Sequence, residues 1–263
     1  MASPFAEAIG DFHTALKMRP VWMALAQEDI GEQHRRTTLG PSWLLINYLL
    51  LVGTFIVVFG YQTDPRAFAR YAASGMLVWL YITDIVTLST SLFVREASFI
   101  KGTRLPFSVY VLRLLMQAII RFGYMALGWA GIMILTGAPV SPGWLWIVPA
   151  LAVILLATVP AIIVFAVSGA FFPDLQFIMQ NLVRVGMFLT PVFWGMDGRI
   201  AGLRGHLYTF NPFTHFLEMF REPVLHGTLP VPSFVICTAI TLALWPMALY
   251  LLGKTRRQIV FVV

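Results

Sequence analysis

The chain has 263 residues, of which 59% are hydrophobic and only 11% are charged, whereas soluble domains carry roughly 25% charged residues. This composition excludes an ordinary soluble domain. The apolar stretches are continuous rather than alternating, so the sequence predicts an all-α integral membrane protein instead of a β-barrel. The net charge is +6, but the basic residues lie beside apolar stretches, where they set membrane topology. We therefore expect no nucleic-acid partner.

The charged first part of the chain, residues 1–42, is a predicted cytoplasmic leader that precedes a transmembrane domain over residues 43–263. Trp22 and Ile30 recur at helical spacing, with acids and amides between them. This pattern predicts an amphipathic helix that lies along the membrane surface and then turns into the bilayer. The alternative is a solvated leader.

Six spans are predicted in the transmembrane domain, because each apolar stretch is long enough to cross a bilayer. They cover residues 43–60, 74–93, 107–136, 144–170, 176–195 and 234–253. Before the first span, Arg35 and Arg36 are followed by Trp43, which suits the headgroup level. The inner flanks hold more basic residues than the outer flanks if both termini are cytoplasmic, so we expect that orientation.

Charged residues also occur inside the predicted spans. Asp84 lies in the second span and Arg184 in the fifth. In the third span, Arg113, Gln117 and Arg121 are four residues apart, so they share one helix face. One interpretation of this face is a polar wall that meets phosphate or sugar. The second is a set of interhelical ion pairs, or an Arg113 that is still at the cytoplasmic surface. We favour the second interpretation, because charges at this depth normally pair within a bundle.

The loop over residues 94–105 joins spans two and three on the cytoplasmic side. Its centre is apolar, with Phe99 and Ile100. Charged residues flank this centre, namely Arg95, Glu96 and Lys101. A small apolar anchor with a polar rim is typical of a docking surface, so the loop is interpreted as a short helix that contacts a partner protein. A simple positive-inside loop is the alternative.

A long external segment over residues 196–233 precedes the last span. Asn211 is a good N-cap and Pro212 suits the first helical turn. The next residues predict an amphipathic helix at, or dipping into, the outer membrane face, ending at Pro223. Its apolar stripe is Phe213, Phe216, Leu217 and Phe220, and its polar residues, facing elsewhere, are His215, Glu218, Arg221 and Glu222.

Three motifs carry a family resemblance, in the order Leu-Gly-Pro-Ser-Trp (39–43), Thr-Pro-Val-Phe (190–193) and Asn-Pro-Phe-Thr followed by Arg221. Together they resemble the permease subunit of polysaccharide-exporting ABC transporters of the ABC-2 type. One feature of the family is missing, because Phe172-Pro173-Asp174 keeps only the acid of its usual Arg-Asp pair.

The resemblance implies a homodimer with two copies of a separate ABC ATPase, in contact with membrane lipid in the bacterial inner membrane. It implies a lipid-linked polysaccharide of O-antigen or capsule type as the substrate. Two alternatives are export of a small lipid-like molecule or drug by the same fold, and an intramembrane transferase.

The resemblance also implies roles for particular residues. Spans one and five line the pore in the family, which points to Phe55, Phe59, Phe188 and Trp194; an aromatic belt at the interfaces is the alternative. The loop holds a coupling helix that contacts the ATPase, with Arg95, Glu96, Phe99, Ile100 and Lys101. The interface or gate residues are Trp22, Arg35, Arg36, Trp43, Asn211, Pro212, Phe216 and Arg221.

The sequence offers no catalytic site of its own. Gly253-Lys254-Thr255 lacks the earlier glycine of a phosphate-binding loop, since Ala248 stands in its place. The histidines and acids form no metal-ligand pattern, so we expect no metal, no cofactor and no enzyme activity. Any ATP-driven function therefore requires a nucleotide site on another subunit.

Overall fold

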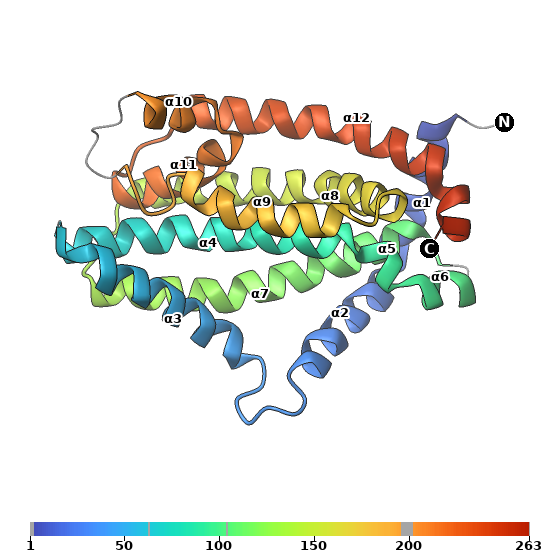
Figure 1. The fold of residues 1–263 in the computed structure, drawn as a ribbon, viewed down its shortest axis with the longest axis horizontal. Helices are drawn as coiled ribbons and strands as arrows, with labels where there is room; N and C mark the ends of the chain where they lie inside the picture. Colours follow the sequence, from blue (N-terminus) through green and yellow to red (C-terminus); the bar gives the residue numbers. More distant parts are fainter. Residues whose placement is uncertain (1–2, 63, 104, 196–201, 263) are drawn as a thin grey trace.

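The computed structural model describes residues 3–62, 64–103, 105–195 and 202–262, which fold as helices joined by turns and short loops, without a strand among them. Figure 1 shows the long helices side by side. The elements are α1 Pro4–Lys17, α2 Arg19–Gln33, α3 Ser42–Phe59, η1 Gly60–Gln62, α4 Pro65–Thr90, α5 Leu92–Arg95, α6 Ala97–Gly102, α7 Phe107–Leu135, η2 Pro142–Trp146, α8 Ile147–Phe171, α9 Leu175–Leu189, α10 Leu203–Phe210, α11 Pro212–Leu225 and α12 Val231–Val262.

Five stretches of the described chain are long and apolar enough to cross a membrane: α3, α4, α7, η2 with α8, and α12. By length and composition, they correspond to five of the six predicted spans. The remaining predicted span, 176–195, corresponds to α9, an apolar helix of 15 residues. It ends at Leu189 because Thr190 is extended, the conformation favoured before a proline. The last helix, α12, continues to Val262, beyond the predicted end at 253.

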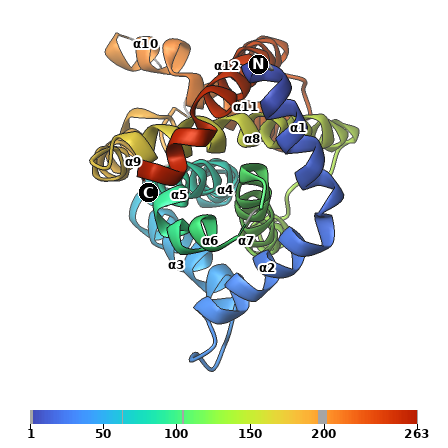
Figure 2. The ribbon, with the colours of Figure 1, turned by 90° about the vertical axis from the view of Figure 1, so that its right-hand side faces the viewer.

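The helix α4 lies at the centre of the bundle and contacts α3, α7, α8, α9 and α11. Small residues allow this close packing. Gly169 of α8, for example, faces the Thr90 carbonyl so closely that a Cβ would lie 1.8 Å from its oxygen. By contrast, only 11% of α3 is buried. Figure 2 shows α3 and α9 both to the left of α4, whereas Figure 1 shows α9 above α4 and α3 below it.

The leader contains two helices. The predicted helix around Trp22 and Ile30 is present as α2, which packs along α7, whereas its position on a membrane surface stays a prediction. The sequence analysis missed α1, which packs against α12 and α7. The Asp11 carboxylate of α1 accepts hydrogen bonds from the backbone N–H groups of Phe107 and Ser108, at 3.2 and 2.8 Å. These are unsatisfied donors of the first turn of α7, so α1 caps the helix that follows the 94–105 loop.

Candidate functional site

The end of the bundle that the sequence predicts to face outward brings together the second and third sequence motifs. The Asn211 side chain caps α11 by accepting a hydrogen bond from the Phe213 N–H at 3.0 Å. Its amide nitrogen donates to the Thr190 hydroxyl at 2.8 Å. The same side chain therefore begins α11 and fixes the residue at which α9 ends.

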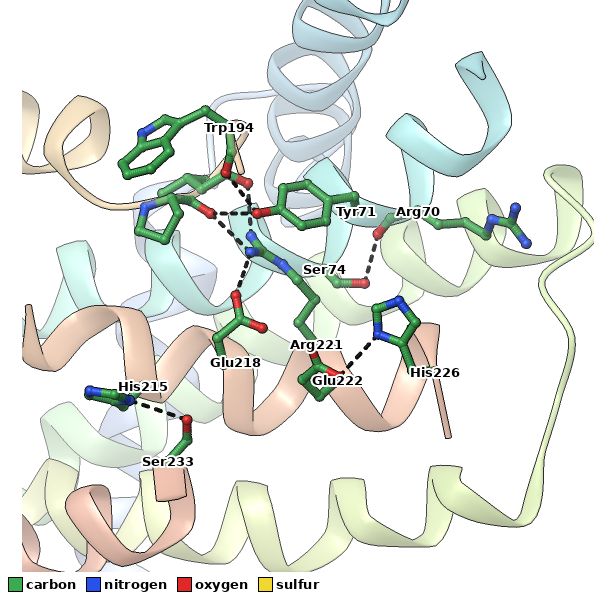
Figure 3. A network of polar contacts seen from close by, with 12 residues as sticks. Arg70, Tyr71, Ser74, Trp194, His215, Glu218, Arg221, Glu222, His226 and Ser233 are labelled. Atoms are coloured by element: carbon green, nitrogen blue, oxygen red, sulfur yellow. Dashed lines mark hydrogen bonds and ion pairs between the residues drawn. The ribbon is translucent and has the colours of Figure 1, made fainter. Parts of the chain in front are cut away.

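Arg221 extends this connection. Its guanidinium donates to the carbonyls of Pro191 and Val192, at 2.9 and 2.8 Å (Figure 3). It also pairs with Glu218 at 2.9 Å, and Arg221 is only 1% exposed. Charge-assisted hydrogen bonds of this kind are the stronger ones in proteins. They hold the chain after α9 in one conformation.

The helix α4 completes the arrangement from the other side. The Tyr71 hydroxyl donates to the Trp194 carbonyl at 2.7 Å, and the Tyr71 ring lies 3.8 Å from the Arg221 guanidinium carbon. Gly75 leaves room for the arginine, because a Cβ there would lie 2.0 Å from Arg221 Nη2. We call Tyr71, Asn211, Glu218 and Arg221 the outer clasp, since they grip residues 190–194 from α4 and α11.

The outer clasp corrects the predicted faces of α11. The sequence pattern placed Glu218 and Arg221 away from the packed side, yet both are buried. Periodicity counts polar side chains as solvent-facing and cannot reveal that Arg221 donates to backbone carbonyls of a distant segment and to Glu218. Pro223 also does not end the helix, which continues to Leu225. Residues 196–201 of the predicted external segment lie outside the described residues.

The segment held by the outer clasp carries an aromatic cluster. The Phe193 ring lies 4.8 Å from Phe55, 5.5 Å from Phe59 and 5.7 Å from Phe188, between ring centroids. Three of the four predicted pore aromatics therefore meet around a residue that the prediction omitted. The signal for Phe193 was available, because it ends the Thr-Pro-Val-Phe motif. Phe188 remains 60% exposed, so the aromatic cluster forms part of the surface.

The fourth predicted aromatic, Trp194, is next to the aromatic cluster rather than in a ring contact with it. Its indole N–H donates to the Phe188 carbonyl at 3.0 Å, and the Arg204 guanidinium carbon lies 5.9 Å from its ring centroid. Trp194 thus closes the turn that follows α9.

A second polar site lies at the opposite end of the bundle. Arg113 of α7 donates twice to Asp29 of α2, at 2.6 Å for each bond. It also pairs with Glu96 at 2.9 Å, and Gln117 donates to Asp29. We call Asp29, Glu96, Arg113 and Gln117 the inner clamp. It joins the leader, the 94–105 loop and α7.

The polar stripe of the third span is therefore made of ion pairs, as we favoured. Arg121 lies 3.1 Å from Asp84 and connects α7 to α4. The sequence analysis missed Asp29, whose only signal was its place in a run of charged leader residues. Arg184 differs from these arginines, because its side chain is exposed on α9.

The 94–105 loop contains the predicted short helix, as α5 and α6. Two of its residues are not on the surface as expected: Glu96 is buried in the inner clamp, and Ile100 packs into the hydrophobic core. Phe99 is 46% exposed, beside the exposed Arg95 and Lys101. The apolar surface of the loop is therefore smaller than predicted.

The remaining interface residues are spread over the molecule. The Trp22 indole donates to the Ala15 carbonyl at 3.1 Å and joins α2 to α1. Arg35 and Arg36 are exposed between α2 and α3, and Trp43 is 36% exposed at the start of α3. Pro212 is in the first turn of α11, and Phe216 packs against the core. Within the described ranges, no group of three His, Cys, Asp or Glu side chains could hold a metal ion.

Comparison with known proteins finds relatives that share one name. No protein-family model matches the chain. Two proteins named O-antigen export system permease protein RfbA, from Klebsiella pneumoniae, are each 22% identical over 210 residues, covering 79% of this chain and 81% of theirs. A protein of the same name from Myxococcus xanthus is 21% identical over 237 residues, covering 86% and 89%. The predicted resemblance to polysaccharide-export permeases is confirmed.

Proposed function

We propose that the chain is the permease subunit of an ABC exporter that moves lipid-linked polysaccharide across the bacterial inner membrane. A homodimer of the chain binds two copies of a separate subunit that hydrolyses ATP. Similarity to permeases named for O-antigen export, over about four fifths of the chain, supports this function. The five apolar helices support the multi-pass membrane location.

The single observation that carries the proposal is the aromatic cluster between α9 and α3, the least buried of the five candidate spans. Phe55 and Phe59 of α3 meet Phe188 and Phe193 at the outer end of α9. Flat aromatic faces contact the C–H surfaces of sugars without holding them tightly, which suits a polymer in motion. We assign this side, between α3 and α9, to the passage that two copies of the chain enclose.

In this proposal α9 is the sixth span, and both termini are cytoplasmic. Its 15 residues rise about 22 Å at 1.5 Å per residue. Residues 190–194, which form turns and bends after α9, complete the crossing. The outer clasp then has a mechanical purpose, because it holds the end of this short span and the aromatic residues attached to it.

The energy of ATP hydrolysis reaches the chain at the opposite end of the bundle, where the inner clamp lies. The ATPase docks on the exposed surface of the 94–105 loop, with Phe99 as its apolar contact. The inner clamp transmits the movement, since Glu96 of the loop and Asp29 of the leader bind the same arginine of α7. The loop and the leader therefore move α7 together.

The test is export in a cell. The chain is expressed with its proposed ABC ATPase partner, in a bacterium that synthesises the matching polysaccharide but lacks its own exporter. We expect surface polysaccharide, detected by antibody, only when both proteins are present. An ATPase with its Walker lysine replaced by alanine is the control, and it should give none. Surface polysaccharide that forms without the permease, or its absence when both folded proteins are present, contradicts the proposal.

A further inference from the structure

The helix α9 carries polar side chains on one exposed face. Gln180, Asn181, Arg184 and Phe188 are spaced so that they lie on the same side of a helix. All four are exposed. Phe188 belongs to the aromatic cluster, so this polar face continues directly into it.

The opposite face of α9 packs against the bundle. A Cβ at Gly186 would lie 3.0 Å from the Trp79 ring, and Val183 is buried. Gly186 is two residues from Arg184, about 200° around a helix of 3.6 residues per turn. Arg184 therefore points away from α4. A third face, with Ile178, Leu182 and Val185, is exposed and wholly apolar.

Arg184 has no acidic partner among the described residues, because none of their ion pairs includes it. By contrast, Arg113 and Arg121 of α7 and Arg221 of the outer clasp each pair with a carboxylate. Figure 1 shows α9 alongside the central part of α4 and α8. Charged side chains at this level pair or face a water-filled cavity, because lipid contact is costly. The apolar face can meet lipid, but the face of Arg184 cannot.

We propose that Arg184 binds an anionic group of the substrate as it passes α9, with Gln180 and Asn181 donating and accepting hydrogen bonds beside it. This inference rests on the proposed function. An arginine fork fits phosphate and carboxylate equally, through paired hydrogen bonds. The anion is therefore either the phosphate that joins the sugars to a lipid carrier or an acidic group on the sugars themselves.

The first experiment measures whether the face of Arg184 meets water. In a Cys237→Ser background, Arg184→Cys is labelled with a charged, membrane-impermeant thiol reagent in proteoliposomes, with and without the ATPase and ATP. Leu182→Cys on the apolar face is the matched control. We expect labelling of Arg184→Cys at least about tenfold faster than that of Leu182→Cys. Equal, slow labelling under both conditions, or a disulfide joining two copies at Arg184→Cys, overturns the inference.

The second experiment measures anion binding. Gln180→Cys is labelled in the presence of a polyprenyl diphosphate without sugars, or of the polysaccharide without its lipid. Protection by the first assigns the anion to the carrier, and protection by the second assigns it to the sugars. We expect several-fold slower labelling with one of them, lost when Arg184→Gln is added and kept with Arg184→Lys. No protection by either ligand overturns the inference.

Export separates this inference from the proposed function. We expect Arg184→Gln to lower export about tenfold or more, the range for losing a hydrogen bond to a charged group. If the unaltered chain exports polysaccharide and Arg184→Gln does so equally well, only the role of Arg184 is wrong. If the unaltered chain exports nothing, the proposed function fails, whatever the labelling shows.

Discussion

The outer clasp and the inner clamp each surround a buried arginine, but they bind different partners. Arg221 donates to two backbone carbonyls of the segment after α9 and to Glu218 on its own helix. Arg113 donates to two carboxylates on separate parts of the chain, Asp29 and Glu96. The two backbone carbonyls belong to consecutive residues of one segment, so the outer clasp fixes the conformation of that segment. The two carboxylates belong to separate elements, so either can leave Arg113 while the other stays bound. The inner clamp is therefore a movable joint.

This difference makes distinct predictions for stability and for coupling. Breaking the outer clasp should unfold the outer end and lower the stability of the whole bundle. Breaking the inner clamp should leave a folded protein in which the leader and the loop move independently.

Arg221→Met should have the largest effect. It leaves Glu218 buried without its partner and removes donors from two carbonyls, and breaking a buried pair costs about 3–5 kcal/mol. We expect a large fall in the unfolding temperature of the detergent-purified protein, or loss of folded protein altogether. Arg66→Ala, at an exposed position of α4, is the matched control. Equal unfolding temperatures for Arg221→Met and the control would show that the outer clasp does not stabilise the fold.

Asp29→Asn weakens the inner clamp without removing all of its ion pairs. It removes the charge of the carboxylate that accepts hydrogen bonds from Arg113. A hydrogen bond to a charged group contributes about 1.5–3 kcal/mol. Glu96 still pairs with that arginine. We expect a folded protein that binds the ATPase and hydrolyses ATP but exports less. Glu28→Gln, one residue away and exposed, is the control. Normal export per ATP hydrolysed by Asp29→Asn contradicts the proposed joint.

Phe99→Ala separates docking from coupling. Removing an apolar anchor at an interface costs on the order of 2 kcal/mol of binding free energy, and its 46% exposure predicts little change in the fold itself. We expect the ATPase to co-purify at roughly thirty-fold weaker affinity. Val140→Ala, exposed in the turn between α7 and η2, should bind normally. Unchanged affinity for Phe99→Ala places the docking surface elsewhere.

The outer clasp should also give a small pH dependence. Burial raises the pKa of Glu218 above its ordinary value of 4.5, while Arg221 acts in the opposite direction. A raised pKa means that the folded state holds the proton more tightly than the unfolded state. The stability that this proton contributes is therefore complete below pH 4.5, and it is lost as the pH rises through the pKa of Glu218 in the folded protein. The unfolding temperature should fall over that window relative to Glu218→Gln. A constant difference between the two proteins contradicts this.

The sequence predicted the helices better than the contacts between them. Composition and length alone identified five spans, because an apolar run of sufficient length has few alternatives in a membrane. The predicted span at 176–195 was harder, since Pro191 ends α9 early. The motifs around Thr190 and Asn211 were recognised one by one, but their contact joins residues about twenty positions apart in the chain. Periodicity does not carry that information.

The same limit explains which residues were missed or misplaced. Glu96 was interpreted as part of a polar rim, because the sequence does not show that Arg113 lies within 2.9 Å of it. Asp11 caps α7 across 96 positions of the chain, and no local pattern marks such a cap. Phe193 belongs to the Thr-Pro-Val-Phe motif, but its importance follows from its central place among three other rings, which the sequence does not show.

The most direct test of the account is ATP-driven uptake of polysaccharide by inverted membrane vesicles that contain the permease and its ATPase. Phe193→Ala removes the centre of the aromatic cluster, Phe193→Leu keeps its bulk without the ring, and Phe210→Ala is an exposed aromatic control outside it. We predict that both Phe193 variants bind the ATPase but lose most uptake, while Phe210→Ala transports normally. Uptake by Phe193→Leu equal to that of the unaltered protein would contradict the assignment of the aromatic cluster to the polysaccharide passage.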